Sequence, residues 1–140
     1  MSLYNVDMIT RAYKLAEKAH QGQFRRDGIT PYFEHPKAVA KNFIDPYYIA
    51  TALLHDTIED TQVREEDLVS EQFPSQVIEA ILLLTKTPEV GILDYLLKIK
   101  ENQIARAVKI ADIEHNSLTS TKEKLQQYRL YLYVLGYPHE

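Results

Sequence analysis

Apolar residues recur at intervals of three and four positions along most of the chain, which is the spacing of amphipathic helices. In the first such segment, residues 6–20, one helix face would carry Ile9, Ala12, Tyr13, Ala16 and Ala19. The strict apolar–polar alternation of half-buried strands is absent, and the chain has only four glycines. The pattern therefore predicts an all-α bundle of about seven or eight helices.

Capping and turn residues divide the N-terminal part of this pattern into elements. Asn5 is expected to cap the first helix and Gly22 to end it. Residues 31–34 are expected to be extended, since a proline disfavours helical geometry in the residue before it. His35 and Pro36 then open a second helix, because proline is tolerated in a first turn.

Asp45 and Pro46 begin the third predicted helix as its N-cap and its first residue. Its inner face would carry Ile49, Ala52 and Leu53, and its C-terminal part would carry His55 and Asp56. Later helices are expected over residues 62–72, 74–84, 91–100, 102–116 and 120–135.

The most apolar of these later segments is 74–84, and it is predicted to be the most buried. Ser120 and Glu123 have the spacing of a capping box at the start of the last helix. Gly136 is expected to end that helix, and His139 to lie in an unstructured tail.

Composition narrows the class of protein. The 140 residues are 45% apolar and 26% charged, which is typical of one globular domain, expected over 1–140. The net charge of −4 argues against a nucleic-acid-binding protein. No cysteine occurs, so the chain has no disulfide and no thiolate metal ligand. No signal-peptide pattern or run of about 20 apolar residues occurs, so no membrane partner and a cytoplasmic location are expected.

Four ionisable residues, His55, Asp56, Glu59 and Asp60, lie within six positions directly after an apolar run. Burying such groups costs several kcal/mol each unless they are paired or bind a metal. A buried hydrogen-bonded pair is one interpretation of His55 and Asp56. A metal or catalytic site accounts for the whole cluster.

A metal site would need ligands from other parts of the chain. His55 and Asp56 are adjacent, so on a regular helix they diverge by about 100° and could share an ion only at a helix end. His35 at a helix start and Asp112 in an otherwise apolar helix are the candidates to complete the set. Two imidazoles and two carboxylates suit a divalent ion such as Mn²⁺ or Fe²⁺.

Taken together, the motifs resemble the HD-superfamily hydrolase domain of the RelA/SpoT alarmone enzymes, most closely the stand-alone small alarmone hydrolases. The similarity runs in order from the first helix to about Thr119. It rests on Ala19-His20-Gln21-Gly22-Gln23-Phe24-Arg25, Pro31-Tyr32, His35-Pro36, His55-Asp56, Glu59-Asp60-Thr61, Lys109-Ile110-Ala111-Asp112 and His115-Asn116.

The resemblance implies roles for individual residues. Its metal ligands fall on His35, His55, Asp56 and Asp112, with one divalent ion, usually Mn²⁺, while Fe²⁺ and Zn²⁺ stay open. Its catalytic pair, which positions or activates the attacking water, falls on Glu59 and Asp60. Its substrate contacts fall on Arg25, Arg26, Asn116 and Thr119. Lys109 could bind phosphate or pair with a ligand carboxylate.

The implied reaction is removal of the 3′-diphosphate from guanosine tetra- or pentaphosphate, with a small phosphorylated nucleotide as partner. Two family arginines are replaced here, by Ile113 and Leu118, which bears on recognition of so highly charged a substrate. The alternatives are therefore a phosphohydrolase of another nucleotide and a non-catalytic nucleotide sensor. His20 and His115 are interpreted as structural. The tyrosine-rich last helix is interpreted as core or as a homodimer surface.

Overall fold

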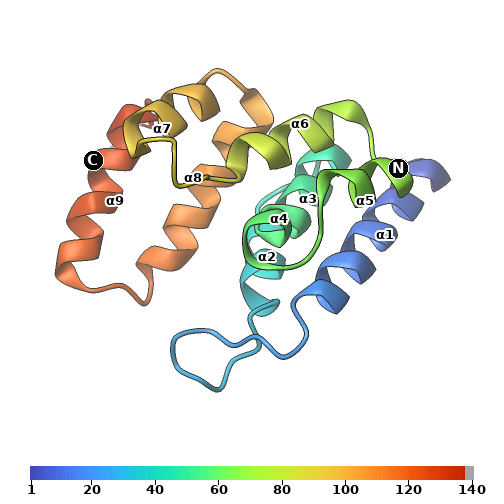
Figure 1. Cartoon of the computed structure of the whole chain (residues 1–140), viewed down its shortest axis with the longest axis horizontal. Coiled ribbons are helices and arrows are strands. Elements are labelled where there is room, and N and C mark those ends of the chain that lie inside the picture. The colour runs from blue at the N-terminus through green and yellow to red at the C-terminus, as the bar shows by residue number, and fades with distance from the viewer. Residues whose placement is uncertain (138–140) are drawn as a thin grey trace.

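The computed structural model describes residues 1–137 and is entirely helical apart from one isolated bridge between Phe24 and Pro31 (Figure 1). The expected tail at His139 lies outside the described residues. The helices are α1 (Leu3–Ala19), α2 (Glu34–Ala40), α3 (Pro46–Leu54), α4 (Thr57–Asp60), α5 (Glu65–Ser70), α6 (Ser75–Leu84), α7 (Ile92–Lys100), α8 (Gln103–Ser117) and α9 (Lys122–Val134). The predicted all-α class is confirmed. Beyond the expected seven or eight helices, the described residues contain α4, a single turn that the sequence did not separate from α3.

Helix α3 forms the centre of the fold and packs against α1, α2, α6 and α8. As predicted, the Asp45 side chain caps it, accepting a hydrogen bond from the Tyr47 amide at 2.9 Å. Residues 50–54 are all buried, because alanine and threonine let neighbouring helices approach on every side. The prediction that 74–84 would be the most buried helix is wrong. Helix α6 buries four of its ten residues, whereas α3 buries five of its nine.

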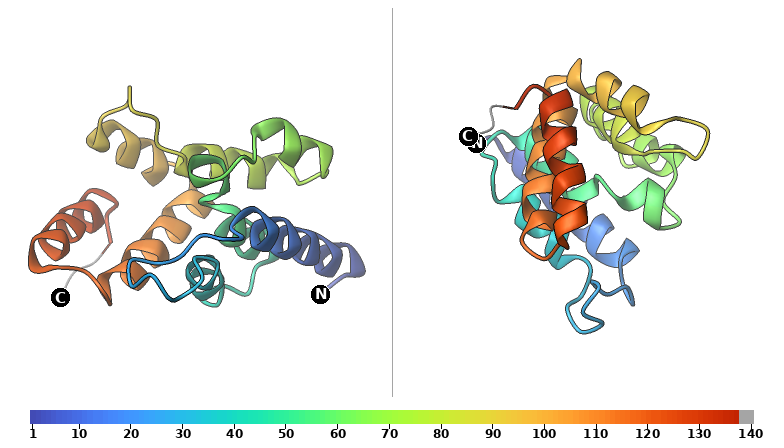
Figure 2. Two further views of the ribbon diagram at one scale, coloured as in Figure 1. Left: turned by 60° about the horizontal axis from the view of Figure 1, so that its bottom comes forward. Right: turned by 90° about the vertical axis from the view of Figure 1, so that its left-hand side faces the viewer.

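Helix α8 joins the two ends of the molecule. It packs against α2, α3 and α6 on one side and against α7 and α9 on the other. Figure 2 shows α9 lying alongside α8. In α9, Leu132 and the following Leu135 are buried whereas Tyr133 is 80% exposed, so only part of this tyrosine-rich segment belongs to the core. None of the described helices has the length and apolar character needed to cross a membrane.

Two cap predictions are wrong by one to three residues. Helix α1 is capped by Ser2, whose hydroxyl accepts from the Asn5 amide at 3.1 Å. Helix α9 is capped by Thr121, which accepts from the Lys124 amide, whereas the Ser120 hydroxyl donates to a carbonyl of α8. Each stretch offers more than one residue able to cap, and the packing of the helix selects among them.

The segment 31–34 is extended only at Pro31. Residues 32 and 33 form a turn, and Phe33 already has helical dihedral angles. Proline restricts the residue before it rather than those after it, so the chain is free to turn into α2. This turn brings Tyr32 and His35 beside α3.

Candidate metal centre and adjoining cavity

The break between α3 and α4 presents His55 and Asp56 in one direction. His55 is the last residue held by α3, and Asp56, with φ −104° and ψ 0°, begins α4. On an uninterrupted helix two adjacent side chains would diverge by about 100°. The change of direction removes that obstacle, as a shared ion requires.

Helices α2 and α8 bring the other two candidate ligands to the same point. His35 Nε2 lies 2.7 Å from Asp112 Oδ1 and 3.8 Å from Asp56 Oδ2. His55 Nε2 lies 3.1 Å from Asp56 Oδ2 and 3.3 Å from Asp112 Oδ1. One ligand atom from each of the four residues lies within 4.8 Å of every other. All four predicted ligands therefore converge, although 77 positions separate His35 from Asp112.

These spacings suit a divalent cation. With metal–ligand bonds of about 2.1 Å, neighbouring ligand atoms on an octahedron stand about 3 Å apart and opposite ones about 4.2 Å. The measured separations cover this range. Two nitrogen and two oxygen donors are the mixture expected for Mn²⁺, Fe²⁺ or Zn²⁺. The largely buried His/His/Asp/Asp cluster is consistent with a divalent metal site.

The charges of the cluster also favour a cation. Burial raises the pKa of Asp112, but the Lys109 ammonium and the two histidines lower it by more than burial raises it. The pKa of Asp112 therefore lies well below its ordinary value. Burial lowers the pKa of His55, but Asp56 and Asp112 raise it well above its ordinary value. Burial raises the pKa of Asp56 too, but His55 lowers it below its ordinary value. Both carboxylates therefore stay charged, and a bound cation would compensate them.

Neighbouring groups fix the orientation of three candidate ligands. The Ala52 carbonyl accepts from His55 Nδ1 at 2.6 Å, which leaves Nε2 facing the cluster. The Tyr32 hydroxyl donates to Asp56 Oδ2 at 2.6 Å. Lys109 Nζ donates to Asp112 Oδ2 at 3.0 Å and lies 5.6 Å from the centre of the Tyr95 ring. Lys109 thus makes the carboxylate contact that was one of the two roles expected for it.

Glu59 and Asp60 lie on α4, one turn beyond Asp56, and both are exposed. Glu59 Oε1 accepts from the Lys86 backbone amide at 2.7 Å, which ties α4 to the segment after α6. Although Asp60 is exposed as a whole, its carboxyl group is partly desolvated, and this desolvation together with the charges of Asp56 and Glu59 raises the pKa of Asp60 to about 6. A carboxyl group with this pKa can exchange a proton near neutral pH.

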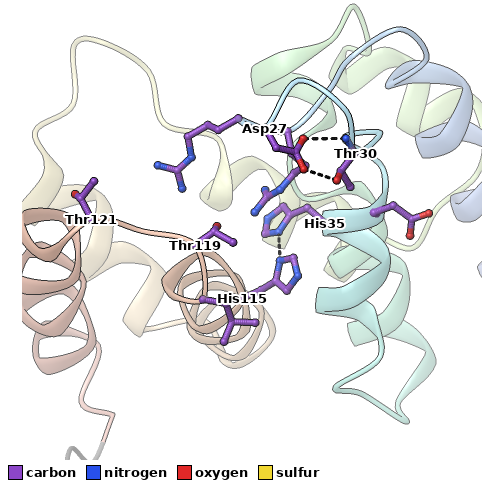
Figure 3. Close-up of a pocket in the computed structure, with 10 residues that line it drawn as sticks. Asp27, Thr30, His35, His115, Thr119 and Thr121 are labelled. Atoms are coloured by element: carbon purple, nitrogen blue, oxygen red, sulfur yellow. Dashed lines mark hydrogen bonds between the residues drawn. The ribbon is translucent and has the colours of Figure 1, made fainter.

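A cavity of about 540 Å³ opens next to the cluster, between the loop 24–31 and the end of α8 (Figure 3). Of the predicted substrate contacts, Arg25, Arg26 and Thr119 line it, and His35 belongs to both the cavity and the cluster. The remaining lining residues are Asp27, Thr30, Glu34, His115, Leu118 and Thr121.

Asn116 connects the cavity to the cluster. Its amide donates to Asp112 Oδ1 at 3.2 Å, and its Oδ1 accepts from Arg25 Nη2 at 3.1 Å. The loop that carries Arg25 is closed by Asp27, which accepts from the amides of Ile29 and Thr30. These hydrogen bonds, with that of the Thr30 hydroxyl, lower the pKa of Asp27 to about 2. Lys109 is not among the cavity-lining residues.

The two positions where family arginines are replaced differ in their surroundings. Ile113 is buried in the core at 1% exposure, so it does not reach the cavity. Leu118 is 78% exposed and lines the cavity. Of the two changes, only the one at Leu118 therefore alters the wall of the cavity.

Three residues near the cluster have no part in the site predicted from sequence, in which His20 and His115 are interpreted as structural and Tyr32 has no role. Tyr32 contacts Asp56, and His115 contacts His35. His20 is buried beside Tyr32, with its Nε2 lacking a hydrogen-bond partner within residues 1–137. Helical spacing could have indicated His115, because it follows Asp112 by three positions and shares its helix face. No comparable signal marks Tyr32.

Two proteins with similar sequences are much longer than this chain. A family model described as "HD domain" matches residues 12–111. "GTP pyrophosphokinase" of Myxococcus xanthus is 39% identical over 133 residues, covering 82% of this chain and 17% of that protein. "GTP pyrophosphokinase rsh" of Brucella melitensis is 33% identical over 130 residues, with the same coverage of 82% and 17%. The chain thus spans less than a fifth of the length of these relatives.

A solved structure reported under the words "A metazoan ortholog of SpoT hydrolyzes ppGpp and plays a role in starvation responses" has the same fold. Its TM-score is 0.71 at 23% identity, covering 91% of this chain and 83% of that one. The HD domain match includes His35, His55 and Asp56 and ends one residue before Asp112. Since that match extends over well more than half of the sequence, this chain belongs to the HD domain family.

Proposed function

We propose that the protein is a metal-dependent phosphohydrolase of a small phosphorylated nucleotide. The observation that carries this proposal is the contact between two features: a His/His/Asp/Asp cluster suited to a divalent ion, and a cavity lined by two arginines. His35 lies in both, so a phosphate in the cavity would sit beside the ion. Mn²⁺ is the proposed ion, because it accepts both imidazole and carboxylate ligands.

His35, His55, Asp56 and Asp112 would hold the ion, which when bound polarises a phosphoryl oxygen and lowers the pKa of water. Glu59 and Asp60 would orient the attacking water and take up its proton, a role that the raised pKa of Asp60 supports. Arg25 and Arg26 would bind the phosphate oxygens, and Asn116 and Thr119 the sugar. Lys109 would hold Asp112 in place rather than touch the substrate.

The proposed substrate is guanosine 3′,5′-bis(diphosphate), with release of its 3′-diphosphate. The support is similarity: the motifs resemble alarmone hydrolases, and a protein with this fold is described as hydrolysing ppGpp. A phosphohydrolase acting on another nucleotide is the second candidate. It is favoured by Leu118, which gives the cavity an apolar wall in place of a cation.

A substrate panel with added Mn²⁺ tests the proposal. It contains guanosine tetraphosphate, 3′-phosphorylated nucleotides with fewer phosphates, and simple monophosphates. We expect release of diphosphate from guanosine tetraphosphate at a kcat/KM at least about tenfold above the others, a difference of about 1.4 kcal/mol. Preference for a less charged nucleotide would support the second candidate. Binding of nucleotide without turnover of any would replace hydrolysis by a sensor function.

Arg25→Ala is expected to raise KM by about tenfold or more with a smaller effect on kcat, because a charged hydrogen bond to phosphate contributes about 1.5–3 kcal/mol. Steady-state kinetics on the best panel substrate measures this. Arg25→Lys is the matched variant, because it keeps the charge but loses the bidentate geometry. Its KM should lie between that of the unchanged protein and that of Arg25→Ala. A change in thermal stability with unchanged KM would show that Arg25 only holds Asn116.

A further inference from the structure

His115 makes a short contact with a candidate metal ligand. Its Nδ1 lies 2.7 Å from His35 Nδ1, and Figure 3 shows the two rings joined at this point. His115 follows Asp112 by one helical turn on α8, so a single helix face carries both residues. At 2.7 Å two ring nitrogens must share a proton, because two lone pairs or two N–H groups would repel each other.

Binding of an ion by His35 determines which ring supplies that proton. Nε2 of His35 points into the cluster, 2.7 Å from Asp112 Oδ1, so a metal-binding lone pair must be on Nε2. A neutral imidazole carries one proton, which in His35 is then on Nδ1. His115 Nδ1 must accept it, so the proton of the neutral His115 ring is on Nε2.

The His115 side chain also lines the cavity. His115 is half-buried and lines the cavity with Arg25 and Thr119. Within residues 1–137, no protein group makes a hydrogen bond with its Nε2. Because Nδ1 is occupied by His35, Nε2 is the ring nitrogen left to serve a ligand in the cavity. A neutral N–H donor in a cavity that Arg25 also lines suits a phosphate oxygen.

We propose that His115 is a positioning residue for the metal site that also binds substrate. Its Nδ1 fixes the ring orientation and tautomer of His35, and its Nε2–H donates to a phosphate oxygen of the nucleotide. The substrate half of this proposal rests on the proposed function, whereas the metal half requires only that the cluster binds an ion. The reading of His115 as purely structural would then be incomplete.

Nitrogen-15 NMR of the histidine rings tests the tautomers directly. The full chain would be loaded with Zn²⁺ alone, a diamagnetic ion for which the ligand set is suitable. We expect an unprotonated Nδ1 and a protonated Nε2 for His115, and a protonated Nδ1 for His35. A proton on Nδ1 of His115 in the loaded protein would overturn the proposal.

Two variants separate the two halves. His115→Asn keeps an acceptor near the position of Nδ1 but has nothing at Nε2, so the Kd for Mn²⁺ should stay within about threefold while KM rises about tenfold. His115→Gln places its amide near Nε2 and loses the inner acceptor, so the Kd for Mn²⁺ should rise about 10–100-fold, as for other groups that orient a metal ligand. Calorimetric titration with Mn²⁺ and steady-state kinetics measure both values.

Glu114→Gln is the matched control, because Glu114 is the exposed neighbour of His115 on the same helix. This variant should change neither the Kd for Mn²⁺ nor KM. An unchanged Kd for Mn²⁺ in His115→Gln overturns the positioning role. An unchanged KM in His115→Asn overturns the phosphate contact. If no nucleotide in the panel is hydrolysed, the proposed function fails, but the NMR and Mn²⁺ titrations still decide the role of His115 toward His35.

Discussion

Asp56→Asn is expected to abolish Mn²⁺ binding and hydrolysis together. Asp56 Oδ2 lies 3.1 Å from His55 Nε2 and 3.8 Å from His35 Nε2, at the centre of the ligand cluster. An amide of the same shape removes one of two anionic ligands. Because loss of a group that only orients a ligand already costs 10–100-fold in affinity, loss of a ligand charge should weaken the Kd for Mn²⁺ by more than about 100-fold.

Elemental analysis of the purified variant and calorimetric titration with Mn²⁺ measure this loss. The fold should survive, because an amide oxygen still accepts the hydrogen bond that the Tyr32 hydroxyl donates to Asp56. Helical circular dichroism therefore serves as the control. A variant that keeps stoichiometric Mn²⁺ with an unchanged Kd would exclude Asp56 as a ligand and leave His55 and Asp56 as a buried hydrogen-bonded pair.

Glu59→Gln and Asp60→Asn are expected to show the opposite combination, with metal retained and turnover reduced by about 10²-fold or more. Both side chains lie outside the ligand cluster, one turn along α4. The glutamine at 59 can still accept from the Lys86 amide, so α4 should keep its place. The loss would then reflect handling of the water and its proton, measured as kcat at saturating Mn²⁺.

Asp60→Asn should also raise the melting temperature of the metal-free protein at pH 7. The folded chain raises the pKa of Asp60 to about 6, from an ordinary value of 3.8, so it holds that proton more strongly than the unfolded chain does. The resulting stability is present below pH 3.8 and is lost as the pH rises through 6. The neutral amide avoids that loss. An unchanged kcat in both variants would reduce Glu59 and Asp60 to a structural part of α4.

Local sequence predicted much of the helical framework. The cap at Asp45, the start of α8 at Asn102 and the end of α9 before Gly136 depend on one or two neighbouring residues, and all three are confirmed. Predictions failed where several residues could serve equally well, as at Ser2 and Thr121. The burial of α3 also escaped prediction, because burial depends on how many helices surround a segment, and its short side chains do not reveal that.

The sequence by itself determined the all-α class and the types of residue available for chemistry: histidines and carboxylates without cysteine, and arginines in the loop 24–31. Only the tertiary structure decided which of these groups meet. The break after α3 turns His55 and Asp56 in one direction, and the packing of α2 and α8 against α3 brings in His35 and Asp112. The contact between His35 and His115 spans 80 positions. Helical spacing from Asp112 could mark His115, but no local sequence signal shows that its ring meets that of His35.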